Sequence, residues 1–259
     1  MTQYALVRRP SPRLAEGLVT HIDRTPVDPE LALQQWVCYV AALQQYGWAT
    51  TEVFPAPDCP DSAFVEDTMV VFRDVAVLAR PGADERKPEV EAAAKAVAQF
   101  GYRLVPIESP GTLDGGDVLK VGDTVYVGNG GRTNREGIAQ LAAALEPLGA
   151  TVVTVPLTKV LHLKSAITAL PDGTIIGWEA AVDEVSLFPG FVAMPEESGS
   201  HVVLLGDRTL LLSADCPRSA ALLRDRGYHV VTVDIGEYIK LEGCVTCLSV
   251  RLREAPHAP

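Results

Sequence analysis

The chain has 259 residues, of which 47% are hydrophobic and 21% charged, with a net charge of −11. This composition supplies a large core and argues against disorder. An acidic surface repels phosphate backbones, so nucleic acid is not expected as a partner, whereas a small cationic substrate is compatible. There is no apolar signal region, no membrane-length run and only five scattered cysteines. We therefore expect a cytoplasmic protein without disulfides or a membrane partner.

Four helices are predicted, and each has an apolar stripe at helical spacing and ends at a glycine. The first runs from Asp28 to Gly47, with aspartate as its N-cap and proline at the first helical position. The others are expected at 88–101, 133–149 and 215–227. The third of the four opens with a capping box that begins at Thr133.

A strand follows each terminal glycine, and then come an irregular polar stretch and a hairpin. The hairpins are expected to turn at 72–75, 121–124, 171–174 and 205–208. Aspartate lies at or beside each turn, often next to glycine, as is usual for hairpins. The recurring unit is therefore strand, turn, strand, helix, strand.

The interval before the last helix is too long for one unit. It holds the hairpin at 165–178 and a degenerate helix around 182–188, which together form an abbreviated unit. The C-terminal strand 248–252 and the N-terminal strand 4–8, with the first helix, would form a fifth unit and close a ring. This repetition predicts a five-unit, propeller-like α/β ring. The alternative is an ordinary mixed α/β domain whose hairpins only look alike.

The segments that precede the hairpins and the last strand carry the reactive side chains. They are 64–67, 113–117, 161–164, 196–200 and 243–247. In a pseudo-symmetric ring, equivalent positions lie around one axis, so these segments would converge at the centre. They offer carboxylates in three segments, one histidine and a cysteine, Cys247. That set can supply a nucleophile, a general acid/base and an electrostatic clamp.

Each of these residues also has a structural interpretation. A histidine in an apolar segment, such as His162, is most often a satisfied buried residue. Asp114 and Asp117 flank Gly115 and Gly116, so the loop could be only a turn with aspartate–backbone hydrogen bonds. We favour that interpretation for Asp117, whereas Asp114 is the freer carboxylate and the glycines indicate close backbone approach. The shared position in the repeat favours catalysis for the set.

Other motifs are weak or absent. Cys244 and Cys247 have the spacing of a redox pair or of half a zinc site, but there is no second pair and no thioredoxin-like context. The glycine-rich segment 128–131 lacks the helix and acidic partner of a dinucleotide loop. No Walker, HExxH or GxSxG motif occurs.

Four segments in order along the chain resemble the dimethylarginine dimethylaminohydrolase family. They are 64–67, 111–117, 159–164 and 243–249. The family has the five-bladed α/β-propeller (pentein) fold, so the resemblance implies a single catalytic domain over 1–259. It implies hydrolysis of Nω-methylated L-arginine to L-citrulline and dimethylamine or methylamine through a covalent cysteine thiouronium intermediate. It also implies that neither a metal nor another cofactor is needed.

The resemblance implies roles for the reacting groups. Cys247 would be the nucleophile and His162 the general acid/base. Asp114 would hold the guanidinium and assist His162, while Asp67, with Glu66 beside it, would bind the remaining guanidinium N–H groups. Flanking carboxylates raise a thiol's pKa and a cationic substrate lowers it, so Cys247 is expected to be a thiol until substrate binds.

The resemblance also implies groups that bind the amino-acid end of the substrate. Asp61 and the Leu18 carbonyl would receive the α-amine, and Arg86 and Arg132 the α-carboxylate. The Leu241 carbonyl would lie beside the site.

Two features remain open in this comparison. Segment 14–21 resembles the family's mobile lid. Cys244 stands where the family commonly has glycine, and it could bring a second thiol to Cys247 or merely pack.

Two alternatives also stay open. The first is an arginine deiminase-like hydrolase of another guanidine, and the second is a non-catalytic ring-fold binding protein. The chain would be a monomer or a homodimer.

Overall fold

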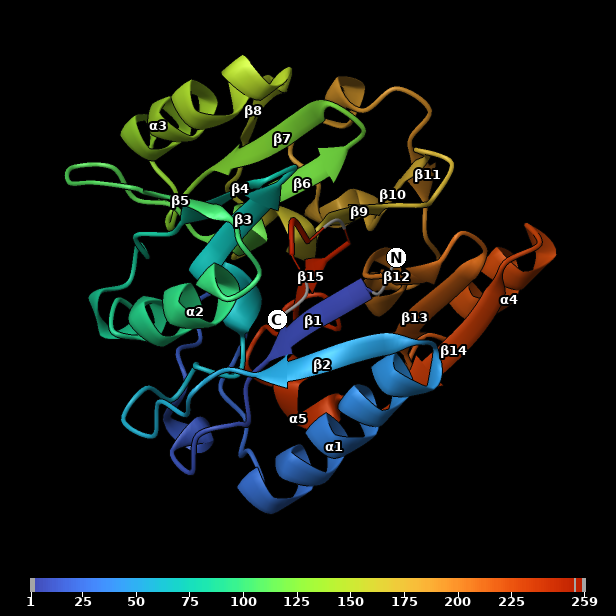
Figure 1. Ribbon diagram of the computed structural model, residues 1–259. Coiled ribbons are helices and arrows are strands. Elements are labelled where there is room, and N and C mark those ends of the chain that lie inside the picture. The colour runs from blue at the N-terminus through green and yellow to red at the C-terminus, as the bar shows by residue number, and fades with distance from the viewer. Residues whose placement is uncertain (1–2, 254, 258–259) are drawn as a thin grey trace.

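The computed structural model describes residues 3–253 and 255–257, and these form five three-stranded sheets around a common centre (Figure 1). In every sheet the first two strands pair antiparallel and the third joins the second in parallel. This arrangement confirms the predicted five-unit ring.

Four sheets are built from consecutive strands. They are β3 (Met69–Phe72), β4 (Val75–Leu78) and β5 (Arg103–Pro106); β6 (Val118–Val121), β7 (Thr124–Asn129) and β8 (Thr151–Pro156); β9 (Ile167–Ala169), β10 (Ile175–Gly177) and β11 (Val192–Ala193); and β12 (Val203–Gly206), β13 (Thr209–Ser213) and β14 (His229–Val233). The fifth sheet joins the two ends of the chain, as predicted: β15 (Val250–Leu252) pairs with β1 (Gln3–Val7), which pairs with β2 (Trp48–Glu52). Backbone hydrogen bonds between β15 and β1 thus close the ring.

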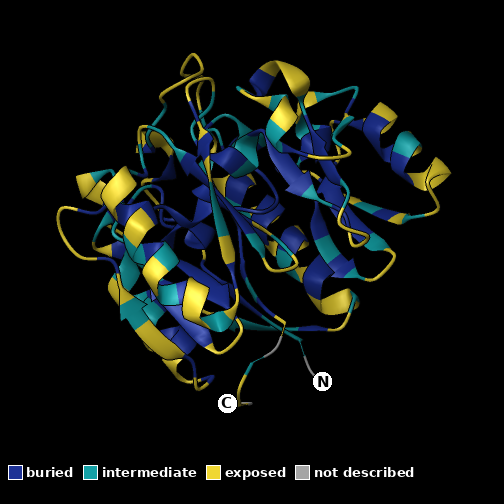
Figure 2. Cartoon of the chain, turned by 90° about the horizontal axis from the view of Figure 1, so that it is seen from above, coloured by how far each residue is buried: buried dark blue, intermediate teal, exposed yellow. Residues whose placement is uncertain are grey.

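Helices connect the second and third strands on the outside of the ring (Figure 1). They are α1 (Pro29–Gln45), α2 (Glu89–Ala98), α3 (Arg135–Leu145) and α4 (Pro217–Asp225). In the β9–β11 unit two short 3₁₀ turns, Glu179–Ala181 and Val185–Leu187, replace the helix, as the degenerate pattern predicts. A further helix, α5 (Gly236–Ile239), was not expected from the sequence. Exposed residues concentrate on the outer helices and loops (Figure 2).

The helix ends show one wrong prediction. Asp28 caps α1 by accepting the N–H groups of Glu30 and Leu31, as expected. The cap of α3 is Asn134 rather than Thr133, because the Thr133 hydroxyl instead donates to Asp117 at 2.6 Å. The four predicted terminal glycines all have positive φ, between 79° and 89°.

The hydrophobic cores lie between neighbouring units rather than on the ring axis. One core, for example, packs Val70 of β3 and Val77 of β4 against Val127 of β7 and Leu141 of α3. Polar segments therefore lie around the ring axis. Among the described residues no helix is long and apolar enough to cross a membrane.

Candidate active site

Short turns bring four of the five predicted segments together at the centre; the carboxylates of the fifth, 196–200, do not join them, because Glu196 pairs with Arg218 and lines a different cavity. The turns Val65–Thr68, Gly115–Asp117 and Leu163–Ser165 immediately precede β3, β6 and β9. The backbone N–H of Gly116 donates to Asp67 Oδ1 at 2.8 Å, and the N–H of Glu66 donates to the carbonyl of Cys247 at 3.1 Å. These hydrogen bonds link segments that are far apart in the sequence.

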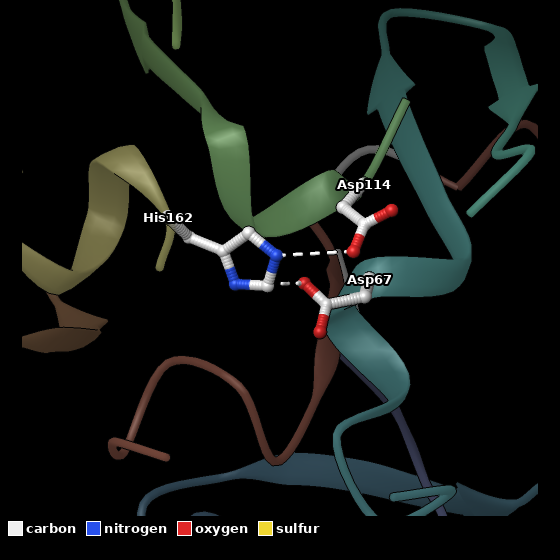
Figure 3. Close-up of side chains that lie close together, drawn as sticks. All are labelled: Asp67, Asp114 and His162. Carbon is white, nitrogen blue, oxygen red and sulfur yellow. Dashed lines mark hydrogen bonds and ion pairs between the residues drawn. The ribbon is translucent and has the colours of Figure 1, made fainter. Parts of the chain in front are cut away.

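His162 lies between two carboxylates (Figure 3). Its Nε2 is 3.0 Å from Asp114 Oδ2, and its Nδ1 is 3.8 Å from Asp67 Oδ1. Burial alone would lower the imidazole pKa, but the charge of Asp67 and the hydrogen bond to Asp114 raise the pKa of His162 to about 9. The imidazole is therefore protonated at neutral pH and can donate a proton.

Asp114 lies behind His162 and does not line the cleft. Its side chain is fully buried, and Oδ1 accepts the backbone N–H of Gly82 at 3.0 Å. The sequence implied that Asp114 also holds the guanidinium; in this geometry its direct contact is with the imidazole. Asp114 is therefore placed to orient His162 and to stabilise its positive charge.

Asp67 is held by Arg86. Arg86 Nη1 is 2.6 Å from Asp67 Oδ2, and Nη2 is 2.8 Å from Glu89 Oε2. Burial raises the pKa of Asp67, but His162 and Arg86 outweigh it and lower the pKa to about 2. Arg86 also donates to the carbonyls of Asp61 and Phe64. Most of its donors are thus used within the protein, and its role here is to hold Asp67 ionised.

Glu66 turns away from the cleft. Its Oε1 pairs with Lys164 and Arg251, each at 2.7 Å, and its side chain lines a different cavity. Residues 66 and 67 lie in one 3₁₀ turn, and their side chains line different cavities. The expected guanidinium contact therefore falls to Asp67, and Glu66 is placed as a structural ion pair.

Cys247 lines the same cleft as Asp67 and His162. Its Sγ lies 3.3 Å from the Sγ of Cys244. Because the two thiols share a hydrogen bond, loss of the first proton of the pair is favoured and loss of the second is disfavoured. The hydrogen bond to Cys247 thus lowers the pKa of Cys244 to about 5. The same hydrogen bond, then burial and the charges of Glu66 and Asp67, hold the pKa of Cys247 well above its ordinary value. This direction agrees with the expectation of a free-enzyme thiol.

The remaining predicted residues border the same cleft. Its lining includes Leu18, Asp61, Arg86, Arg132 and Leu241. The buried Nη1 of Arg132 has no hydrogen-bond partner among the described residues and lies 3.8 Å from Asp114 Oδ2. Arg132 thus brings a guanidinium group, the natural partner of a carboxylate, to the lining of the cleft.

The lid segment is fastened by two acidic residues. Asp61 accepts the N–H of Leu18 at 3.1 Å, while Glu242 accepts the N–H groups of Thr20 at 2.5 Å and His21 at 2.9 Å. Sequence reasoning missed Glu242. Its position directly before Gly243 of the cysteine segment was the available signal.

Asp117 supports the histidine rather than serving only its own turn. Its Oδ1 accepts the N–H of Leu163, beside His162, at 3.0 Å, and Oδ2 accepts the Thr133 hydroxyl. Burial raises the pKa of Asp117 to about 6. No local sequence signal indicates this long-range contact.

Asp67, Asp114 and His162 also have donor atoms within 4.8 Å of one another, as in a metal site. Arg86 brings a fixed positive charge to 2.6 Å from Asp67, which opposes a cation there. The arrangement fits a proton-transfer site better than a metal site.

Comparison with known proteins yields consistent matches. The family model for arginine deiminase matches residues 45–186. The chain is 64% identical over 250 residues to the N(G),N(G)-dimethylarginine dimethylaminohydrolase of Streptomyces coelicolor, covering 96% of this chain and 97% of that one. It is 34% identical to the enzyme of that name from Pseudomonas aeruginosa, covering 97% and 100% of the two chains.

The structure is similar to two solved forms of the dimethylarginine dimethylaminohydrolase. One is the Pseudomonas aeruginosa enzyme with a cysteine-to-serine change, complexed with citrulline (TM-score 0.90, 33% identity, 97% of this chain and 100% of that one). The other has a histidine-to-glycine change and is an adduct with S-methyl-L-thiocitrulline (TM-score 0.90, 32% identity, the same coverage).

Proposed function

The chain belongs to the dimethylarginine dimethylaminohydrolase family, and on that premise we propose that Cys247, His162 and Asp114 carry its reaction. The activity is hydrolysis of Nω-methylated L-arginine to L-citrulline and dimethylamine or methylamine, at a C–N bond of a linear amidine. The observation that supports the residue assignment is the shared cleft, which is lined by Cys247 and by His162, whose imidazole lies between two buried carboxylates.

The guanidinium of the substrate is received by Asp67. Its carboxylate remains ionised and rigid because Arg86 and the Gly116 N–H hold it. A planar guanidinium paired with a fixed carboxylate is oriented for attack on its central carbon. The substrate's positive charge also lowers the pKa of the Cys247 thiol and favours the thiolate.

The reaction then needs two proton transfers at His162. The Cys247 thiolate adds to the guanidinium carbon, and protonated His162 gives its proton to the departing amine nitrogen. The resulting thiouronium adduct is attacked by water, from which neutral His162 takes a proton. Collapse of the second tetrahedral centre breaks the C–S bond and releases citrulline. Asp114 compensates the imidazolium charge in the first step.

The amino-acid end of the substrate binds at the other end of the cleft. The place of Arg132 in the lining of the cleft supports a contact between its guanidinium group and the α-carboxylate. The Leu18 and Leu241 carbonyls and Asp61 are offered to the α-amine, under the lid held by Glu242. Arg86 contributes mainly by holding Asp67. We further propose that residues 1–259 act as a single catalytic domain.

The test is a citrulline assay with asymmetric dimethylarginine, monomethylarginine and arginine. We expect the methylated substrates to give citrulline and Cys247→Ser to abolish it. Cys38→Ser is the matched control, because Cys38 is an exposed thiol on α1. Unimpaired turnover by Cys247→Ser would contradict the assignment. Faster turnover of arginine than of either methylated substrate would favour the deiminase alternative.

A further inference from the structure

A second cavity lies on the ring axis behind the active-site segments. It has a volume of about 360 Å³. Glu66 and Thr246 line it, whereas their sequence neighbours Asp67 and Cys247 line the catalytic cleft. The segments that contain these residue pairs thus separate the cavity from the catalytic cleft. A ligand in the cavity would therefore not occupy the substrate cleft. Its size is within the range of small-ligand sites.

The charge of this cavity is opposite to that of the whole protein. Its ionisable lining residues are one carboxylate, Glu66, and four cations: Lys120, Lys164, Arg251 and Arg253. Their formal sum is positive, although the chain has a net charge of −11. A concentration of one sign of charge in a concave, partly dry site attracts counter-ions.

Glu66 is the ion-pair partner of the two innermost cations, Lys164 and Arg251. It pairs with both Lys164 and Arg251 at 2.7 Å. Lys120 and Arg253 form no salt bridge with any described residue; Lys120 Nζ donates to the Val71 carbonyl, and Arg253 Nη2 donates to the Leu204 carbonyl at 3.4 Å. Two cations at the outer part of the cavity are therefore without a counter-charge in this part of the structure.

Burial and the neighbouring cations lower the pKa of Lys120 and Arg253. Burial, then Lys164, Arg253 and Arg251, lower the pKa of Lys120 to about 7, and burial, then Arg251, lower the pKa of Arg253 to about 10. Both side chains keep accessible surface, which fits side chains that border a cavity. Mutual repulsion between enclosed cations costs free energy that a bound anion would offset.

The cavity also has a route to the outside. An adjoining cavity of about 430 Å³ shares Lys120, Arg251 and Arg253 and adds Arg73, which pairs with Asp123 at 3.2 Å. The cationic lining therefore continues from the outer cavity to Glu66. An anion approaching through it would meet guanidinium and ammonium donors along the whole path.

We propose that this axial cavity is a binding site for a phosphate-type oxyanion, held by Lys120 and Arg253 with Arg251 at its inner end. Guanidinium groups donate in a fork that matches two oxygens of an oxyanion, and an ammonium adds a point charge. The site lies outside the substrate cleft and goes beyond the hydrolysis of methylated arginine. The ligand is either free phosphate or the phosphate group of a larger monoester.

Calorimetric titration of the full chain with inorganic phosphate, at constant ionic strength adjusted with sodium chloride, tests the site. We expect saturable binding at one site. The double variant Lys120→Met, Arg253→Gln is expected to weaken it by more than tenfold. The control is Lys95→Met, Arg103→Gln, which removes the same charge from exposed residues outside the cavity. Its affinity should stay within twofold of wild type.

Adenosine monophosphate in a parallel titration distinguishes the two sources. Tighter binding of the monoester assigns the site to a phosphorylated metabolite, and tighter binding of inorganic phosphate assigns it to the free ion. Retained citrulline formation by both double variants shows that they are folded. The proposal is overturned if wild type binds neither ligand, if chloride competes as well as phosphate, or if both double variants lose affinity equally.

Discussion

The sulfur atoms of Cys244 and Cys247 lie 3.3 Å apart across a single turn. The N–H of Cys247 donates to the Cys244 carbonyl at 3.1 Å, so the two residues are the ends of a hydrogen-bonded turn. Such turns bring their end Cα atoms within about 7 Å, and a disulfide needs about 4.4–6.8 Å. The spacing of the two cysteines in the sequence is only a weak redox signal, from which we did not assign a redox role, whereas this geometry puts the two thiols in reach of each other.

We expect hydrogen peroxide to inactivate the enzyme reversibly through these thiols. Oxidation of one thiolate to a sulfenic acid, followed by attack of the other sulfur, forms one disulfide and releases two water molecules per peroxide. Mass spectrometry should show the loss of two hydrogens in the peptide that contains both residues, and dithiothreitol should restore citrulline formation. In Cys244→Ala no disulfide can form, so its peptide should show no loss of two hydrogens, and excess peroxide should carry Cys247 on to a sulfinic acid that dithiothreitol does not reduce. Inactivation of the wild type without the loss of two hydrogens would argue against the disulfide.

The kcat/KM of the wild-type enzyme, which reports the ionisation of the free enzyme, should fall as pH rises through about 9. The pKa of His162 is raised to about 9, so its acidic proton is present below that pH and lost above it. Asp114→Asn removes a negative charge that helps to raise this pKa and should move the fall to lower pH. Asp172→Asn, at an exposed hairpin turn, serves as the control. An unchanged profile in Asp114→Asn would contradict the assigned role of Asp114.

Arg132→Gln should raise KM for methylated arginine by roughly 10- to 100-fold with a smaller effect on kcat. Its guanidinium group is proposed to bind the α-carboxylate, which is distant from the reacting carbon, and loss of one charged hydrogen bond costs about 1.5–3 kcal/mol. Steady-state kinetics measure both parameters. A substrate that lacks the α-carboxylate should show the same KM with wild type and variant; a difference there would indicate indirect damage.

Arg86→Gln should instead destabilise the fold. It leaves Asp67 and Glu89 buried without their cation, a change that typically costs about 3–5 kcal/mol. Urea unfolding of this variant and of Arg132→Gln compares the two arginines directly. Equal free energies of unfolding for the two variants would contradict the different roles assigned to them.

Gly116→Ala should reduce kcat by about 100-fold or more. A Cβ atom at this position would lie 2.5 Å from Asp67 Oδ1 and 2.7 Å from His162 Nδ1, so both side chains would have to move, and small displacements of catalytic groups cost about that much rate. Gly131→Ala is the matched control, since nothing lies within 4 Å of its added Cβ. Normal kcat in Gly116→Ala would show that the site tolerates the displacement.

The sequence by itself determined the repeating unit and its closure. Apolar periodicity, terminal glycines and hairpin turns are local signals, and their recurrence predicted that β15 and β1 share a sheet. The repeat also predicted that Cys247 and His162 share the centre, because equivalent positions in a ring face one axis. The roles of individual residues came from the resemblance of four short segments to one enzyme family.

Only the tertiary structure decided which way each side chain faces. Glu66 and Asp67 are adjacent, and no local rule says that one binds Lys164 and Arg251 while the other faces His162. The partners of Arg86 and the approach of Arg132 to Asp114 likewise depend on contacts between segments far apart in the chain. Ion pairing and burial of polar groups are set by such long-range packing, and residue order alone does not encode it in a readable form.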